Sequence, residues 1–250
     1  MRVAVIIPTL DDDAALQRQL ARVARLDPAA DEVIVVDGAA SQACELVCRA
    51  AGAIWVPMHG AWGGQLALGA ARARADVLWF LHLDCEPHTA AVGAIRRSIA
   101  EGAVGGFFRF RFAGPATRLK RMLERCIAWR SRWGLAYGDQ ALFITQAAYA
   151  ATPGFAIQPL FEEVAMVRAL KRTARFAAVA LPITVATRRW ERDGYLWRAL
   201  LDRMLVVGFL CGIAPARLVR WDRGHARPAA AGHRPTRGRS QTGGHEAHKG

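Results

Sequence analysis

The sequence has no apolar run long enough to cross a membrane. Its most apolar stretch, from Met204 to Ile213, is ten residues long, whereas a transmembrane helix needs about 20. The opening residues MRVAVIIPTL do not read as a secretory signal either, because the apolar part ends at Pro8 and residues 11–13 are all Asp.

Paired cysteines are also lacking. There are five cysteines, an odd number, and no C-x-x-C pair occurs among them. A disulfide framework and a zinc site built on such pairs are therefore disfavoured. We expect a protein with reduced thiols in a cytoplasmic setting.

The glycine-rich phosphate loops are absent as well. No G-x-G-x-x-G follows the first apolar run, and G-x-x-x-x-G-K-[ST] occurs nowhere. Neither a dinucleotide-binding fold nor a P-loop is supported, so any phosphate must be held in another way.

What is present is the composition of one packed domain with a tail. The chain has 250 residues, of which 53% are hydrophobic and 22% charged, enough to bury a sizeable core. From Gly224 onward there is no Val, Ile, Leu, Met or aromatic residue. We predict a single domain over residues 1–222 and a disordered basic tail over residues 223–250.

The formal net charge is +13, and most of this surplus belongs to residues 1–222. Such a charge attracts nucleic acid, anionic lipid or phosphorylated small molecules, and a merely solvated basic surface is the plain alternative.

Apolar runs and helical spacing alternate along the first third of the chain. Strands are predicted at residues 3–7, 32–37, 53–57 and 77–83, and helices at 13–25, 41–51 and 64–73. The alternation predicts an α/β fold with a mostly parallel central sheet flanked by helices.

In such sheets ligands bind beyond the carboxyl ends of the strands. The residues at these ends are Pro8 and Thr9, Asp37, and Asp84. Carboxylates at one edge of the sheet can accept hydrogen bonds from a nucleotide base or ribose, or bind a hard divalent cation. An Asp that merely forms a turn is the alternative for either one alone.

Six stretches in order carry a resemblance: AVIIPTL, EVIVVDG, VLWFLHLD, YGDQALFI, PLFEEVAMVRALKR, and TRRWERDG followed by an apolar helix. Over roughly residues 1–222 the chain resembles GT-A-fold, family 2 glycosyltransferases. Within them it is most similar to the subgroup called radical-SAM/selenodomain-associated transferase 2.

This resemblance implies a metal-dependent glycosyltransferase that uses a nucleotide-sugar donor, with inversion at the sugar. Asp84 would be the metal ligand for Mg²⁺ or Mn²⁺, and Glu163, with Glu162 beside it, the catalytic base. The donor would contact residues near the strand ends and the third helix: Pro8, Thr9, Asp11, Asp37, Gly64, Gln65 and Asp84.

Further along the chain, Arg188 and Arg189 beside Trp190 can clamp diphosphate oxygens while the indole stacks on a sugar. Asp139, Gln140 and Trp190 would face the acceptor. The plain alternatives are a solvated charged loop and an ordinary turn.

Several positions depart from the family pattern, among them Asp11, Cys85 and Glu163, where the family usually has Asn, Thr and Asp. A Glu in place of Asp moves the basic oxygen by about 1 Å, enough to affect a positioned base. The alternative function is therefore a degenerate member that binds a nucleotide, or an anionic partner such as nucleic acid or lipid. We expect no nucleic acid as the principal partner, because the strand ends bear acids and no nucleic-acid module is recognisable.

Two basic or apolar segments bear on partners. Residues 107–132 form a basic amphipathic stretch, and residues 195–213 an apolar helix interrupted by Arg198, Asp202 and Arg203. Packing on the domain is one interpretation. Peripheral contact with the inner face of the plasma membrane, with a lipid-linked acceptor, is the other.

Overall fold

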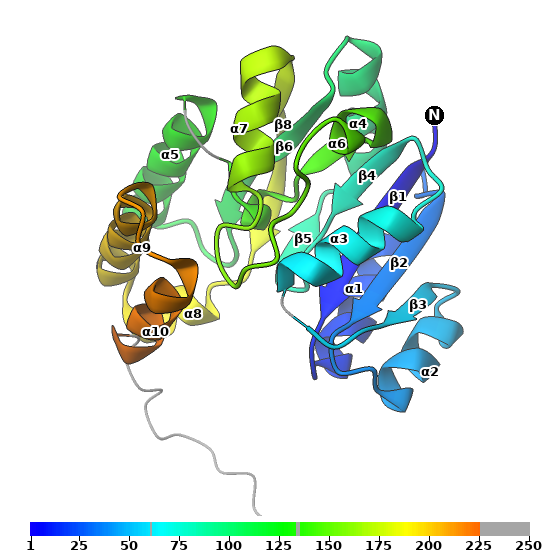
Figure 1. The fold of residues 1–250 in the computed structure, drawn as a ribbon, viewed down its shortest axis with the longest axis horizontal. Helices are drawn as coiled ribbons and strands as arrows, with labels where there is room; N and C mark the ends of the chain where they lie inside the picture. The colour runs from blue at the N-terminus through cyan, green and yellow to red at the C-terminus, as the bar shows by residue number, and fades with distance from the viewer. Residues whose placement is uncertain (61, 134–135, 226–250) are drawn as a thin grey trace, which may run out of the picture.

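The computed structural model describes residues 1–60, 62–133 and 136–225. Its centre is an eight-stranded sheet in the order β3-β2-β1-β4-β7-β6-β8-β5. Figure 1 shows this sheet between two layers of helices. The α/β prediction is confirmed.

The first third of the chain folds as the alternation predicted. In order, its elements are β1 (Val3–Thr9), α1 (Asp13–Val23), β2 (Glu32–Asp37), α2 (Gln42–Ala50), β3 (Ile54–Pro57), α3 (Trp62–Arg72) and β4 (Val77–Phe80). The four strands pair in parallel. β1 is buried along its whole length, because helices cover both faces of a parallel sheet and its strands become continuous Val/Ile runs.

The remaining elements complete the sheet and build a helical flank. They are β5 (Cys85–Pro87), α4 (Ala91–Ala100), β6 (Gly105–Phe112), α5 (Arg118–Trp133), the 3-10 turn η1 (Gly138–Gln140), β7 (Phe143–Thr145), α6 (Gln146–Ala150), α7 (Val164–Thr173), β8 (Phe176–Val185), α8 (Arg188–Asp193), α9 (Tyr195–Leu210) and α10 (Pro215–His225).

The sheet is mixed. β7 runs antiparallel to β4 and β6, and β5 runs antiparallel to β8. The other six strands share one direction, so a mostly parallel sheet describes the centre and the two reversed strands are the exception.

Most of the other predicted boundaries differ from the observed ones by no more than two residues, but two predictions are wrong. The strand expected at residues 77–83 ends at Phe80. The basic stretch 107–132 is not one amphipathic segment, because its first residues belong to strand β6 and its later ones to helix α5. On β6, Arg109 and Arg111 point outward between buried Phe residues, which is the two-residue period of a strand and not the period of a helix.

Each face of the sheet has its own core. α1, α2, α4 and α5 pack on the face that includes Trp79 and Phe143, and α3 and α7 pack on the face that includes Ile6 and Phe80. α9 and α10 pack together at the side of the molecule, where Leu205 meets Leu218.

In the part of the chain that the structure describes, no helix is both long and apolar enough to span a bilayer. α10 continues to His225. The rest of the predicted basic tail, residues 226–250, lies outside the described residues.

Candidate active site

The carboxyl ends of β1 and β2 lie side by side. Thr9 and Asp37 are register partners there, and both are buried. The Asp37 carboxylate accepts hydrogen bonds from the backbone N–H groups of Ala39 at 2.9 Å and Ser41 at 2.7 Å. It also accepts from Trp55 Nε1 at 3.2 Å. Asp37 therefore fixes the loop after β2 with its own side chain.

The start of α3 lies against this loop. Gln65 is buried, and a Cβ placed on Gly38 would come within 2.0 Å of Gln65 Nε2. Only a glycine permits this approach. Gln65 Oε1 and Thr9 Oγ1 are both buried without a hydrogen-bond partner, so this edge of the sheet carries two polar groups that a ligand could satisfy. Pro8 and Gly64 flank them, and Asp11 follows in a left-handed conformation with φ 51°.

Asp84 stands on a turn beyond β4. Leu81 N still donates to Ile6 O at 2.9 Å, but Cys85 N then donates back to His82 O at 3.2 Å. This turn is why β4 is shorter than expected. It leaves the Asp84 side chain exposed while its neighbour Cys85 is buried.

A cavity of about 470 Å³ opens next to Asp84. It lies between the β4 turn, η1, the segment before α7, and the helices α8 and α9. Its charged lining consists of Asp84, Asp139, Glu162, Glu163 and Asp202 together with Arg130, Arg189 and Arg198. A second cavity of about 310 Å³, which Arg188 lines, shares Asp84 and Arg189 with the first.

Glu162 and Glu163 lie just before α7 and are 8% and 4% exposed. Glu163 Oε1 accepts from Gly138 N at 3.2 Å. Burial, and next the charge of Glu162, raise the pKa of Glu163 to about 8. Burial also raises the pKa of Glu162. A carboxyl with a pKa near neutrality is suited to exchange protons.

The turn η1 brings Asp139 to the same cavity. Its Oδ1 is buried without a partner, and burial raises the pKa of Asp139 to about 6 against the opposing charge of Arg130. Gln140, predicted beside it, does not line the cavity. It is fully buried, accepts from Ser131 Oγ at 2.6 Å and donates to Phe108 O at 3.3 Å. The side chain of Gln140 therefore supports the turn from behind.

His82 also faces this cavity. Its Nε2 is buried without a partner, its ring packs against Trp62 at 5.2 Å between centroids, and burial lowers its pKa. A Cβ on Gly138 would lie 2.8 Å from His82 Nε2, so the glycine lets η1 approach the β4 turn.

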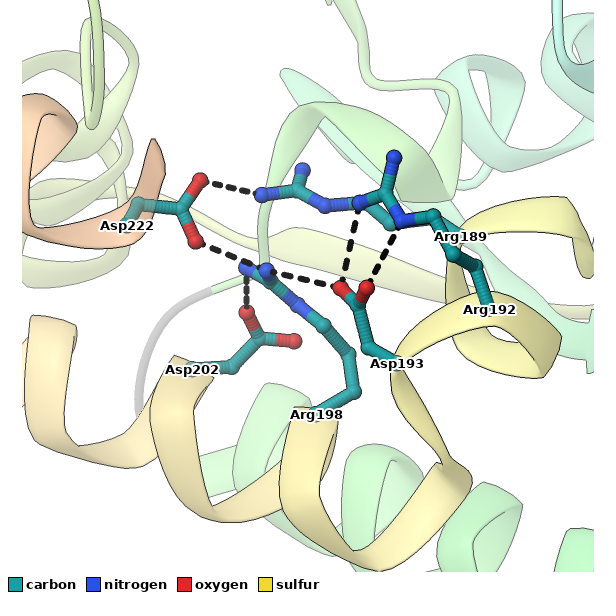
Figure 2. Close-up of polar contacts among 6 residues, drawn as sticks. All are labelled: Arg189, Arg192, Asp193, Arg198, Asp202 and Asp222. Atoms are coloured by element: carbon teal, nitrogen blue, oxygen red, sulfur yellow. Dashed lines mark hydrogen bonds and ion pairs between the residues drawn. The ribbon is translucent and has the colours of Figure 1, made fainter. Parts of the chain in front are cut away.

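Of the two predicted clamp arginines, Arg189 is part of an ion-pair network, shown in Figure 2. Arg189 pairs with Asp222 of α10. Arg198 is 3% exposed and pairs with Asp202, with Asp222 at 2.7 Å and with Asp193 at 3.6 Å. The network ties α8, α9 and α10 together along one wall of the cavity. Trp190 is held in the same wall by Phe112, with ring centroids 4.9 Å apart.

The sequence analysis gave no role in the site to several residues that line the cavity: His82, Arg130, Tyr137, Arg198 and Asp202. For His82 the available signal was its position at the end of the fourth predicted strand, two residues before Asp84. The Arg130 guanidinium lies 4.3 Å from the centre of the Tyr137 ring, a contact that no local sequence pattern predicts.

The side chains present fit a divalent cation. The cavity is lined by five carboxylates and three guanidinium groups. Because carboxylates are in excess, this lining can bind an added cation. Among the described residues, no three His, Cys, Asp or Glu side chains gather to hold a metal by themselves. Mg²⁺ is commonly bound by one or two carboxylates plus substrate phosphates, and the exposed Asp84 suits that arrangement.

A protein-family model described as Glycosyl transferase family 2 matches residues 4–163. The match spans β1 through the Glu162–Glu163 pair, and so includes Thr9, Asp37 and Asp84. No curated protein sequence matches the chain significantly.

Solved structures share the GT-A fold of this chain. One is glucosyl-3-phosphoglycerate synthase from Mycobacterium tuberculosis in complex with Mn²⁺, UDP and glucosyl-3-phosphoglycerate. Its TM-score is 0.58 at 19% identity, over 85% of this chain and 80% of that one. The same enzyme with Mg²⁺ and UDP gives the same values. S. aureus TarS 1–349 in complex with UDP gives a TM-score of 0.56 at 16% identity, over 74% of this chain and 60% of that one.

Proposed function

The chain belongs to glycosyl transferase family 2, and we propose that it transfers a sugar, with inversion, from a UDP-sugar to an acceptor hydroxyl in a metal-dependent reaction. It is a glycosyltransferase with a GT-A fold. UDP is the nucleotide bound by two of its structural neighbours, and this supports a uridine donor here. Assignment to the radical-SAM-associated subgroup, and a transferase domain that ends near residue 222, belong to the same proposal.

One observation carries the proposal. Asp84 and Glu163 line the same cavity, the first exposed and the second buried. A hard cation on Asp84 would neutralise the diphosphate as it departs. The buried Glu163 would take the proton of the acceptor hydroxyl, with its Oε1 positioned by the Gly138 N–H. Burial, and next the charge of Glu162, keep the pKa of Glu163 high.

The donor would lie along the sheet edge. The nucleoside would be near Pro8, Thr9, Asp11 and Asp37, with Thr9 Oγ1 and Gln65 Oε1 as the unpartnered polar atoms there. Gly64 lies beside Gln65 at the start of α3. Arg188 and Arg189 border the cavity that touches Asp84, a suitable place for diphosphate oxygens.

The acceptor side of the cavity is partly apolar. Asp139 and Trp190 line it together with Leu160, Phe161, Leu205 and Val206. This mixture of an acid and an apolar wall fits an acceptor with a polar end and an apolar body, and it favours a lipid-linked acceptor. Such an acceptor would place the enzyme at the inner face of the plasma membrane.

The experiment is calorimetry of UDP and GDP binding with and without Mn²⁺, on the native protein and on Asp84→Ala. We expect UDP binding that requires Mn²⁺ and is lost in Asp84→Ala. Metal-independent binding, or equal binding by the variant, would contradict the role of Asp84. GDP binding in preference to UDP would contradict a uridine donor.

A binding-only member of the family is the second candidate. It is favoured by Glu163, a position where the family usually has Asp, because the added methylene moves the carboxylate oxygen by about 1 Å. Mn²⁺-dependent UDP binding without hydrolysis or transfer of any UDP-sugar would support this candidate.

A further inference from the structure

Helix α9 leaves one apolar face uncovered by the described chain. Leu196, Leu200, Met204, Val207 and Leu210 are 40–62% exposed. Their spacing puts them on one side of the helix, while Leu201 and Leu205 on the other side are buried. Monomeric proteins seldom present an aliphatic row of this length to water without a partner for it.

Helix α5 lies beside α9 and extends this surface. The two helices are in contact, and Lys120 Nζ of α5 lies 5.6 Å from the centre of the Tyr195 ring at the start of α9. α5 exposes Met122 at 48% and Trp129 at 69%. Its other exposed side chains include a row of four arginines: Arg118, Arg121, Arg125 and Arg132.

The acids of these helices point inward. Glu124 of α5 accepts from Phe112 N at 2.9 Å, and Asp202 of α9 pairs with the buried Arg198. Consequently the exposed positions of both helices hold arginines, apolar residues that include Trp129 and Trp197, and Cys126, but no carboxylate. We call this surface, made of the exposed residues of α5 and α9, the α5–α9 face.

We propose that the α5–α9 face docks on an anionic membrane surface. A bilayer interface takes up aliphatic and Trp side chains while arginines bind its lipid phosphates. Nucleic acid would match the arginines but leave the aliphatic row of α9 in water. A second copy would match the aliphatic row, but a two-fold contact through the same face would bring two arginine rows together.

Docking would place the proposed active site next to the bilayer. The inner side of α9 supplies Arg198, Asp202, Leu205 and Val206 to the cavity lining, while its outer side forms the docking face. The idea that docking brings the enzyme to a membrane-borne acceptor rests on the proposed function. Docking on the membrane does not depend on that function.

The test is flotation of the full chain with vesicles of phosphatidylcholine, alone or mixed with phosphatidylglycerol. We expect binding only where phosphatidylglycerol is present, and weaker binding as salt rises. The variant Leu200→Glu with Val207→Glu should weaken binding by about 100-fold, because two apolar side chains no longer enter the interface.

A matched control exists at the far side of the molecule. Leu46 on α2 and Ile54 on β3 are 57% and 50% exposed, and Figure 1 shows these elements away from α5 and α9. Leu46→Glu with Ile54→Glu makes the same change in net charge and should leave binding within about twofold of the native value. Equal losses in both double variants would overturn the proposal, because attraction would then follow net charge alone.

The arginine row is tested in the same way. Changing Arg118, Arg121 and Arg125 to Gln should weaken binding by about 100-fold, since each arginine near an anionic surface contributes about fivefold. Arg25, Arg72 and Arg97 changed to Gln serve as the control on other exposed surfaces.

Three results would overturn the proposal: no binding to phosphatidylglycerol vesicles, equal effects of the matched variants, or a dimer in sedimentation that Leu200→Glu with Val207→Glu dissolves. UDP calorimetry on the same variants separates the two proposals. Vesicle binding without UDP binding would support docking and contradict the proposed function. UDP binding without vesicle binding would contradict docking alone.

Discussion

The β1–β2 end of the sheet and the cavity beyond β4 both bury carboxylates, but their surroundings differ. At the first, Asp37 accepts three N–H groups and thereby shapes a loop. At the second, Glu163 Oε1 accepts a hydrogen bond from the backbone N–H of Gly138 and lies beside Glu162, and burial raises the pKa of Glu163 to about 8. The comparison teaches that burial alone does not make a carboxylate reactive. An acid becomes available for proton transfer when few donors stabilise its charge.

The largest effect is expected on turnover from Glu163→Gln. Glutamine keeps the shape of the side chain, and its Oε1 can still accept from Gly138 N, but it cannot take a proton. The transfer rate measured with a UDP-sugar should fall by about 1,000-fold, while UDP affinity stays within a factor of two. Glu162→Gln is the control and should cost far less. A larger loss in Glu162→Gln would move the base to that residue.

The next effect is on stability and comes from Asp37→Ala. This change leaves the N–H groups of Ala39, Ser41 and Trp55 without their acceptor in a buried loop. The free energy of unfolding should drop by about 3 kcal/mol, which corresponds to a Tm lower by about 10 °C. Asp37→Asn should lie in between, because one oxygen remains. An unchanged Tm in Asp37→Ala would contradict the structural role that distinguishes Asp37 from Glu163.

The pH dependence sharpens the comparison further. With a pKa of about 8, the basic form of Glu163 is the minor form at neutral pH. The value of kcat/KM should therefore rise about tenfold per pH unit below pH 8 and level off above it.

The stability of the fold should move in the opposite direction. Since the folded state raises the pKa of Glu163, the stability gained from its neutral form is fully present below the ordinary Glu pKa. It is lost as the pH rises through about 8. Thermal unfolding of Glu163→Gln should lack this loss, and an identical pH profile in native protein and variant would contradict the raised pKa.

The smallest effect is expected from Arg188→Ala. Arg188 is exposed, so water and salt screen its attraction for a diphosphate. We expect the KM for the donor to rise about threefold, with little change in kcat. Arg25→Ala, at another exposed arginine, is the control. A large loss of kcat in Arg188→Ala would mean that the clamp acts on the transition state.

The fold was predictable where the chain pairs with its near neighbours. Val3 to Ile7 and Glu32 to Asp37 are β-branched runs separated by one helix, and they pair as expected. The prediction failed over residues 107–132, because a run of Phe and Arg fits a strand as well as a helix. Only pairing of β6 with β8, which comes much later in the chain, decides it.

The candidate site likewise contains residues that could be predicted from the sequence and residues that could not. Thr9, Asp37 and Asp84 were accessible to sequence reasoning because each follows an apolar run. Arg130, Tyr137 and Asp202 were not, because they reach the cavity only after α5 and α9 pack beside the sheet. Gln140 shows the reverse case: its place next to Asp139 suggested a shared role, yet the turn directs the two side chains to opposite sides.

The first four strands, the helices between them and the acids at the strand ends follow from the sequence, because hydrophobic periodicity and short connections are local properties. Which acids share a cavity, how far the pKa of Glu163 departs from that of an ordinary carboxyl, and which face of α9 stays uncovered depend on the folded chain. These depend on burial and on neighbours distant in sequence, and desolvation and charge act through space and not along the chain.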